Sequence, residues 1–130
     1  MKIIPRALVM LSALASIIVA LGLWFGMENL LPGMGIATTD LADGLVGRAT
    51  VRADMAGLFG GIGICAALGA IRQSRHWTNS ALLLVSVAIT GRFIGLATDG
   101  AASAVIQPVM VEAATIGLLL WLRATQAEKA

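Results

Sequence analysis

Four long apolar runs limit what this chain can fold into. They cover residues 7–25, 53–71, 80–97 and 104–122. Each run comes close to the ~20 residues with which a helix crosses ~30 Å of hydrocarbon. Because the backbone finds no water to bond with inside a bilayer, such runs form helices. The sequence therefore predicts an all-α integral membrane protein, a four-helix up-down bundle forming a single transmembrane domain over residues 1–130, with a long outer loop over residues 27–52.

Composition supports a membrane protein. Hydrophobic residues make up 58% of the chain, charged residues 12%, and the mean hydropathy is +0.92, whereas soluble domains are roughly 45–50% apolar and about 25% charged. The basic residues lie at the ends of apolar runs and form no cluster, so the lipid bilayer is the expected partner and nucleic acid is not. Cys65 is the only cysteine, which excludes an intramolecular disulfide and a Cys-x-x-Cys motif. No cofactor or metal site is expected.

The distribution of basic residues predicts the orientation in the membrane. Placing both termini on one side gathers six basic residues there, against Arg48 and Arg52 on the other side. The six are Lys2, Arg6, Arg72, Arg75, Arg123 and Lys129. By the positive-inside rule both termini are then cytoplasmic, and the expected location is the bacterial inner membrane. Trp24, Trp77 and Trp121 fall at predicted span ends, where indole rings favour the headgroup level.

The N-terminus has an alternative interpretation as a secretory signal. Lys2 and Arg6 precede an apolar run, and Ala13-Leu14-Ala15 fits a cleavage pattern. Cleavage there leaves only residues 7–12 as the hydrophobic region. An uncleaved first span is favoured, and a processed N-terminus stays open as the alternative.

Small residues recur every four positions in the second apolar run: Ala53, Gly57, Gly61, Cys65 and Gly69. Gly91 and Gly95 repeat this spacing in the third run. Ridges of this kind let helix backbones approach closely in lipid. We therefore expect helix packing at Gly57, Gly61, Gly91 and Gly95, with a homodimer face as the alternative use of such a ridge.

Arg92 and Glu112 each interrupt an apolar run. An isolated charge at mid-membrane costs about 2.5–3.5 kcal/mol on the insertion scale, so opposite charges at similar depth are expected to pair. Arg92 lies six residues before the outer end of its predicted span and Glu112 eight residues into the next. At a rise of about 1.5 Å per residue, both are about 9–12 Å deep in the outer half. The sequence predicts an ion pair between them.

Three further charged residues extend this site in the prediction. Arg92 and Asp99 are seven residues apart and share a helix face, and Asp54 shares the face of Gly57, with Arg52 two residues before it. The predicted network is Arg52, Asp54, Arg92, Asp99 and Glu112. Pro108 bends the last helix one turn before Glu112. Such a network is either a structural ion pair that sets helix register or a polar pocket for a small ligand, a lipid headgroup or a proton.

These residues resemble a family of uncharacterised bacterial four-span membrane proteins in the wider DoxX-like neighbourhood. The resemblance runs from Arg48 to Arg123. It rests on Arg52-x-Asp54 before Gly57-Leu58-Phe59-Gly60-Gly61, on Gly91-Arg92-x-x-Gly95 with Asp99-Gly100, and on Glu112. Aromatic residues are commoner near the aspartate in that family than near Asp54. Because DoxX-like relatives include accessory subunits of membrane oxidoreductases and assembly factors, the resemblance implies an accessory role.

Three functions are consistent with this sequence. The favoured one is a non-catalytic accessory or ligand- or lipid-binding membrane subunit, partnered by a larger membrane complex, a homodimer, or a bound lipid or quinone. The alternatives are a small proton-coupled transporter that uses Glu112, and a quinone- or lipid-handling membrane enzyme. No Ser–His–Asp or Cys–His arrangement is expected, because His76, the only histidine, lies on the side opposite the acidic residues.

Overall fold

The described part of the chain is helical. The computed structural model describes residues 3–34, 45–100 and 103–126, and within these ranges there is no strand. Four helices are long and apolar enough to cross a membrane: Ile3–Phe25, Gly47–Arg72, Arg75–Thr98 and Val105–Thr125. The predictions of an all-α fold and of four membrane-span candidates are confirmed.

The long helices are α1 (Ile3–Phe25), α4 (Ala56–Arg72), α5 (Arg75–Asp99) and α6 (Ser103–Thr125). Three of the four extend beyond the predicted spans, and α4 begins three residues after the predicted start of its span. The predicted outer loop contains the short α2 (Met27–Leu30), a 3-10 turn η1 (Pro32–Met34) and α3 (Leu45–Thr50). A π-helical segment, η3 (Val51–Met55), joins α3 to α4. Residues 35–44 of this loop lie outside the described residues.

The connection between α4 and α5 is tight and uses a left-handed residue. Gln73 has φ 51° and ends α4, and its backbone N–H donates to the carbonyl of Gly69. The N–H of Ser74 donates to the same carbonyl at 3.3 Å. This arrangement satisfies helix-end carbonyls and starts α5 immediately.

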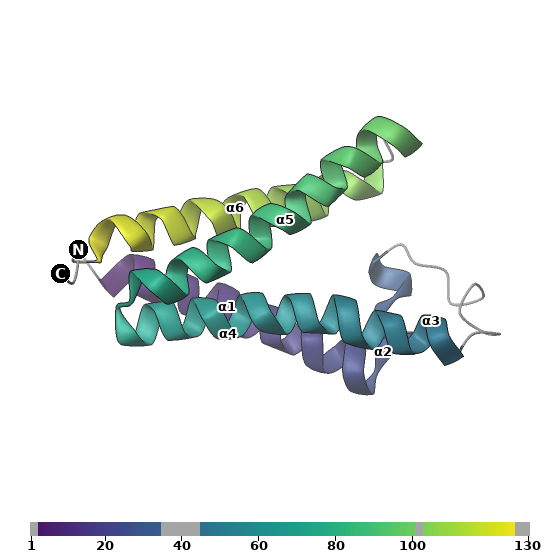
Figure 1. Cartoon of the computed structure of the whole chain (residues 1–130), viewed down its shortest axis with the longest axis horizontal. Helices are drawn as coiled ribbons and strands as arrows, with labels where there is room; N and C mark the ends of the chain where they lie inside the picture. Colours follow the sequence, from purple (N-terminus) through teal and green to yellow (C-terminus); the bar gives the residue numbers. More distant parts are fainter. Residues whose placement is uncertain (1–2, 35–44, 101–102, 127–130) are drawn as a thin grey trace.

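The helices form two pairs, α1 with α4 and α5 with α6, which meet at one end and diverge towards the other (Figure 1). The buried side chains explain this shape. All four helices contribute to one core cluster, which comprises Val9, Ala13, Ile62, Ala66, Ala70, Ala81, Val85, Leu119 and Leu122. A second cluster is built from α1, α2, Leu31 and α4 alone: Ala20, Leu23, Met27, Leu31 and Ala56. Neither α5 nor α6 contributes a described buried residue to this second cluster.

Polar contacts join the four helices where they meet. Arg6 Nε donates to the Ala70 carbonyl at 3.2 Å, and Arg75 Nε donates to the Gln126 carbonyl at 3.1 Å. Gln126 Nε2 donates both to the Gly69 carbonyl, at 3.0 Å, and to Thr78 Oγ1, at 2.9 Å. Gln126 and Thr78 are both buried. We call this end, with its Gln126 contacts, the closed end, and the opposite one the open end.

The glycine contacts differ from the predicted packing ridge. A Cβ added to Gly57 or to Gly91 would meet nothing within 4 Å, so no described helix of this chain packs closely on these two residues. A homodimer contact at them stays a prediction. At Gly61 the added Cβ would lie 3.3 Å from Leu84 Cδ1 of α5. At Gly63 it would lie 2.7 Å from Ile17 Cγ1 of α1, and at Gly69 it would lie 2.6 Å from Thr78 Oγ1 of α5.

The packing differs from the predicted ridge because α4 carries small residues on two faces. The face that packs on α1 is the buried one, with Ala56, Gly60, Gly63, Ala66 and Ala70. The predicted ridge follows the other face, of which only Gly69 is buried. Gly95, the remaining predicted packing residue, is half-buried and lines a cavity described below.

Candidate functional site

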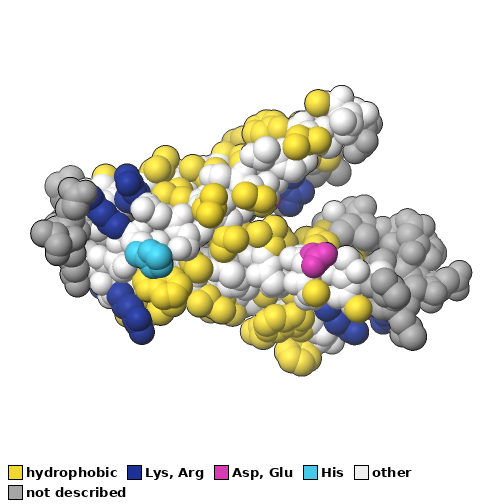
Figure 2. All heavy atoms as spheres, viewed as in Figure 1, with side chains coloured by type: hydrophobic (Ala, Val, Ile, Leu, Met, Phe, Trp, Pro, Cys, Tyr) yellow, Lys and Arg dark blue, Asp and Glu magenta, His cyan; other side chains and the backbone are white. Residues whose placement is uncertain are grey.

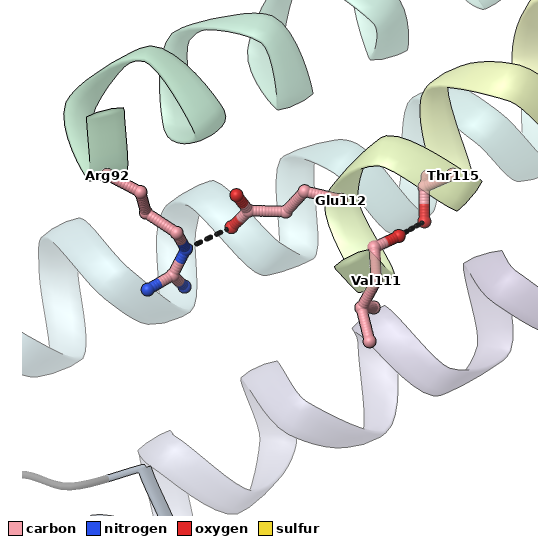
Figure 3. A network of polar contacts seen from close by, with 4 residues as sticks. All are labelled: Arg92, Val111, Glu112 and Thr115. Atoms are coloured by element: carbon pink, nitrogen blue, oxygen red, sulfur yellow. Dashed lines mark hydrogen bonds and ion pairs between the residues drawn. The ribbon is translucent and has the colours of Figure 1, made fainter. Parts of the chain in front are cut away.

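Arg92 of α5 and Glu112 of α6 form an ion pair (Figure 3). Arg92 Nε donates to Glu112 Oε1 at 2.7 Å. The Glu112 side chain is 11% exposed and that of Arg92 31%. The structure thus brings together the two charges that interrupt the apolar runs, and it does so with one hydrogen bond rather than the two of a bidentate arginine–carboxylate pair.

The pair leaves polar atoms of both residues unused. Glu112 Oε2 is buried and accepts no hydrogen bond from any described residue. Figure 3 shows the two terminal nitrogens of Arg92 directed away from the carboxylate. Buried polar atoms in proteins nearly always have a hydrogen-bond partner, so an unpaired carboxylate oxygen at this depth requires an explanation.

Two cavities adjoin at the Arg92–Glu112 pair. Their volumes are about 580 Å³ and about 460 Å³, and both are lined by the same five residues: Met55, Phe59, Arg92, Val111 and Glu112. The larger cavity extends from Ser16 and Val85 to Gly100 at the open end. The smaller one continues to Val19, Leu30, Gly33, Met34, Gln107 and Pro108. Together they form a cleft between the helix pairs, where Figure 2 shows the surface hollowed.

The cleft walls are mainly apolar. Apart from the ion pair, the larger cavity has two hydroxyl groups, those of Ser16 and Thr115. Thr115 Oγ1 donates to the Val111 carbonyl at 2.8 Å, and Ser16 Oγ donates to the Ser12 carbonyl at 3.1 Å. Because these hydroxyl protons are used within their own helices, the unused hydrogen-bond donors of the larger cavity are concentrated at Arg92, and its buried unpaired acceptor is Glu112 Oε2. The smaller cavity adds the exposed side-chain amide of Gln107.

The predicted five-residue network is not assembled. Arg52 and Asp54 are exposed and line neither of the two cavities of the cleft. Both lie in the π-helical segment η3, whose wider turn rotates them relative to the α-helical spacing that the prediction assumed. The side chain of Asp99 lies outside the described residues. Of the predicted site residues, the structure brings together Arg92 and Glu112.

Arg52 instead lines a small polar cavity beside the segment that joins α1 to α4. Trp24 Nε1 donates to the Arg52 carbonyl at 3.1 Å, which ties the end of α1 to η3. The cavity has a volume of about 230 Å³ and is lined by Arg52, Glu28 and Arg48, among others. Glu28 and Arg48 form an ion pair with each other, and the Glu28 side chain is 69% exposed. This second pair is separate from the cleft.

Sequence reasoning missed the apolar residues that both cavities share. Met55, Phe59 and Val111 lie in apolar runs beside residues of the same types, so nothing in their residue types sets them apart. The weak signals were Pro108, one turn before Glu112, and Gly91, beside Arg92. Each of these lines one of the cavities. In the described parts of the chain, no three His, Cys, Asp or Glu side chains come together as a metal site requires.

Comparison of the chain with protein-family models, curated proteins and solved structures gave no match. The functional argument therefore rests on the geometry of the cleft.

Proposed function

We propose that this chain is a multi-pass protein of the bacterial inner membrane that binds an amphipathic, lipid-like ligand in the cleft, as a non-catalytic accessory or ligand-binding membrane subunit. One observation carries this proposal. An ion pair with a buried, unpaired carboxylate oxygen lies where two apolar-walled cavities meet. Ligand sites are typically apolar hollows with a few convergent polar groups, and the cleft has this composition.

A purely structural ion pair accounts less well for these contacts. When a buried pair serves only to fix helix register, the remaining lone pairs and protons need partners within the protein, because desolvating the charges is otherwise too costly. Here Glu112 Oε2 has no such partner among the described residues. A ligand that donates a hydrogen bond to Oε2 would offset that cost.

The proposed topology is the up-down bundle with both termini cytoplasmic, which puts the open end and the cleft in the outer half of the membrane. The excess of basic residues on the terminal side supports this orientation. The DoxX-like resemblance supports an accessory role within a larger membrane complex or a homodimer.

The test is to extract the protein from native membranes into polymer-bounded nanodiscs and to identify the co-purifying molecules by mass spectrometry. Gly91→Leu is the cavity-filling variant, because Gly91 lines the larger cavity and its added Cβ meets nothing within 4 Å. Gly117→Leu is the matched control, since Gly117 of α6 is equally open but lines neither cavity. We expect a lipid that is enriched with wild type and with Gly117→Leu, and depleted with Gly91→Leu.

Two results would count against the proposal. If the co-purifying molecules of Gly91→Leu and wild type are identical, the cleft holds no ligand. If the molecule lost from Gly91→Leu is a quinone and the protein changes its redox state, the chain is a quinone-handling enzyme rather than a binding subunit.

A further inference from the structure

The unused atoms of the ion pair restrict the chemistry of the ligand. Glu112, 9% exposed as a whole residue, presents a buried acceptor at Oε2. The terminal nitrogens of Arg92 carry only donors and a positive charge, and they point away from Glu112 (Figure 3). A complementary ligand must therefore carry an acceptor, best an anionic one, for Arg92 and a separate hydrogen-bond donor for Glu112.

Charge balance further restricts the possible ligands. Arg92 and Glu112 already neutralise each other at a site that is mostly removed from water. A ligand with a net charge would leave that charge uncompensated in a low-dielectric setting, whereas a zwitterion would keep the site neutral. The anion and the donor of the ligand therefore belong to a net-neutral group.

The shape of the cleft indicates how the apolar part of the ligand is divided. Two mainly apolar cavities share the polar pair and the three apolar residues beside it, and the rest of their lining residues are different. One polar group with two apolar branches matches this arrangement better than one polar group with a single tail.

We infer that the ligand is a diacyl phospholipid with a phosphoethanolamine headgroup, whose phosphate lies against Arg92 and whose ammonium donates to Glu112 Oε2, with one acyl chain in each cavity. This inference rests on the proposed ligand-binding function of the cleft and specifies its ligand. A phosphocholine headgroup carries the same charges but has no N–H to donate. A phosphoglycerol headgroup has hydroxyl donors but leaves one net negative charge.

The experiment is native mass spectrometry of the full-length protein in detergent with an equimolar mixture of dioleoyl phosphatidylethanolamine, phosphatidylcholine and phosphatidylglycerol. We expect the phosphatidylethanolamine complex to be about tenfold more abundant than each of the other two, because only this lipid is net neutral and also donates a hydrogen bond to the charged carboxylate. Glu112→Gln removes the carboxylate charge and should reduce the preference over phosphatidylcholine to near unity. Because Arg92 is then uncompensated, the variant should bind phosphatidylglycerol more strongly than wild type does. Glu28→Gln, which removes the carboxylate of the exposed ion pair with Arg48, is the matched control and should keep the preference.

The outcomes separate the inference from the proposed function. Equal binding of the three lipids, or phosphatidylglycerol binding as tightly as phosphatidylethanolamine, overturns the headgroup assignment. If the lipids bind equally but Gly91→Leu abolishes their binding, the proposed lipid-binding function stands and only the headgroup assignment fails. If no phospholipid binds in a manner that depends on Gly91, both fail. Should Glu112→Gln not fold, the wild-type comparison between the ethanolamine and choline lipids decides alone, since they carry the same charges and differ in having N–H donors or methyl groups on the nitrogen.

Discussion

Gly63 of α4 lies against Ile17 of α1 so closely that an added Cβ would be 2.7 Å from Ile17 Cγ1 and 3.2 Å from its backbone nitrogen. The carbonyl oxygen of Ala13 would be 2.8 Å away. Because two of these three atoms belong to the backbone, the contact cannot relax by a side-chain rotation. This close approach makes α1 and α4 one packing unit.

Replacing Gly63 with leucine should therefore destabilise the protein. Overpacking of this kind costs about 1–3 kcal/mol, and the rigid backbone of α1 places the effect at the upper end of that range. Gly57→Leu on the same helix is the control, because its added Cβ meets nothing within 4 Å. Thermal unfolding in detergent, followed by circular dichroism, measures both. Equal melting temperatures for the two variants would show that the α1–α4 contact is looser than described.

Arg92 and Glu112 should be energetically coupled. Loss of either partner leaves a charge uncompensated, at a cost of up to about 3–5 kcal/mol, and loss of both should cost less than the sum. The measurement is a double-mutant cycle with Arg92→Met, Glu112→Gln and the combined variant, by unfolding in detergent. Strictly additive losses would mean that the 2.7 Å contact contributes nothing to stability.

The closed end should depend on Gln126. Its side-chain amide donates to the Gly69 carbonyl and to Thr78 Oγ1, and both Gln126 and Thr78 are buried. Gln126→Met keeps the volume but removes this donor. The Gly69 carbonyl keeps the N–H groups of Gln73 and Ser74, so the loss falls mainly on Thr78 Oγ1, at the lower end of about 1–3 kcal/mol. Ser80→Ala removes a hydroxyl that bonds only to the His76 carbonyl of its own helix, and it should melt near wild type. A Gln126→Met variant as stable as Ser80→Ala would contradict this role.

The proposed orientation is tested by reporter fusions at Ala130. We expect a fluorescent-protein fusion to be bright and an alkaline-phosphatase fusion to be inactive, because the six-to-two excess of basic residues keeps the terminal side in the cytoplasm. Phosphatase activity would invert the topology and would move the cleft to the cytoplasmic half.

The predictable parts of this structure follow from large free-energy costs, those of unsatisfied backbone groups and of unpaired charges in lipid. Apolar runs near 20 residues leave helices as the only way to satisfy the backbone in lipid, which is why the spans could be predicted. Two opposite charges on neighbouring spans have few other partners, which is why the contact of Arg92 with Glu112 could be expected.

The parts that were not predictable depend on smaller free-energy differences between alternative packings and backbone conformations. Both faces of α4 carry small residues, and the choice of the Gly63 face depends on how Ile17 and Ala13 of α1 fit it. The π-helical segment that turns Arg52 and Asp54 away from the cleft has no residue pattern that marks it. Gln126 is a polar residue just beyond the last predicted span, where exposure would be the usual expectation, so its burial at the closed end could not be anticipated.

The divergence of the two helix pairs has a consequence for how the cleft can be filled. The helices that diverge carry exposed apolar side chains on their outer surfaces, among them Leu21, Phe93, Ile94 and Ile106. In the proposed orientation, the cavities therefore open at a depth where hydrocarbon rather than water surrounds the protein. Occupancy at such a site follows the mole fraction of the ligand among the surrounding lipids. Diluting vesicles with buffer should leave the cleft filled, whereas fusing them with an excess of ligand-free vesicles should empty it.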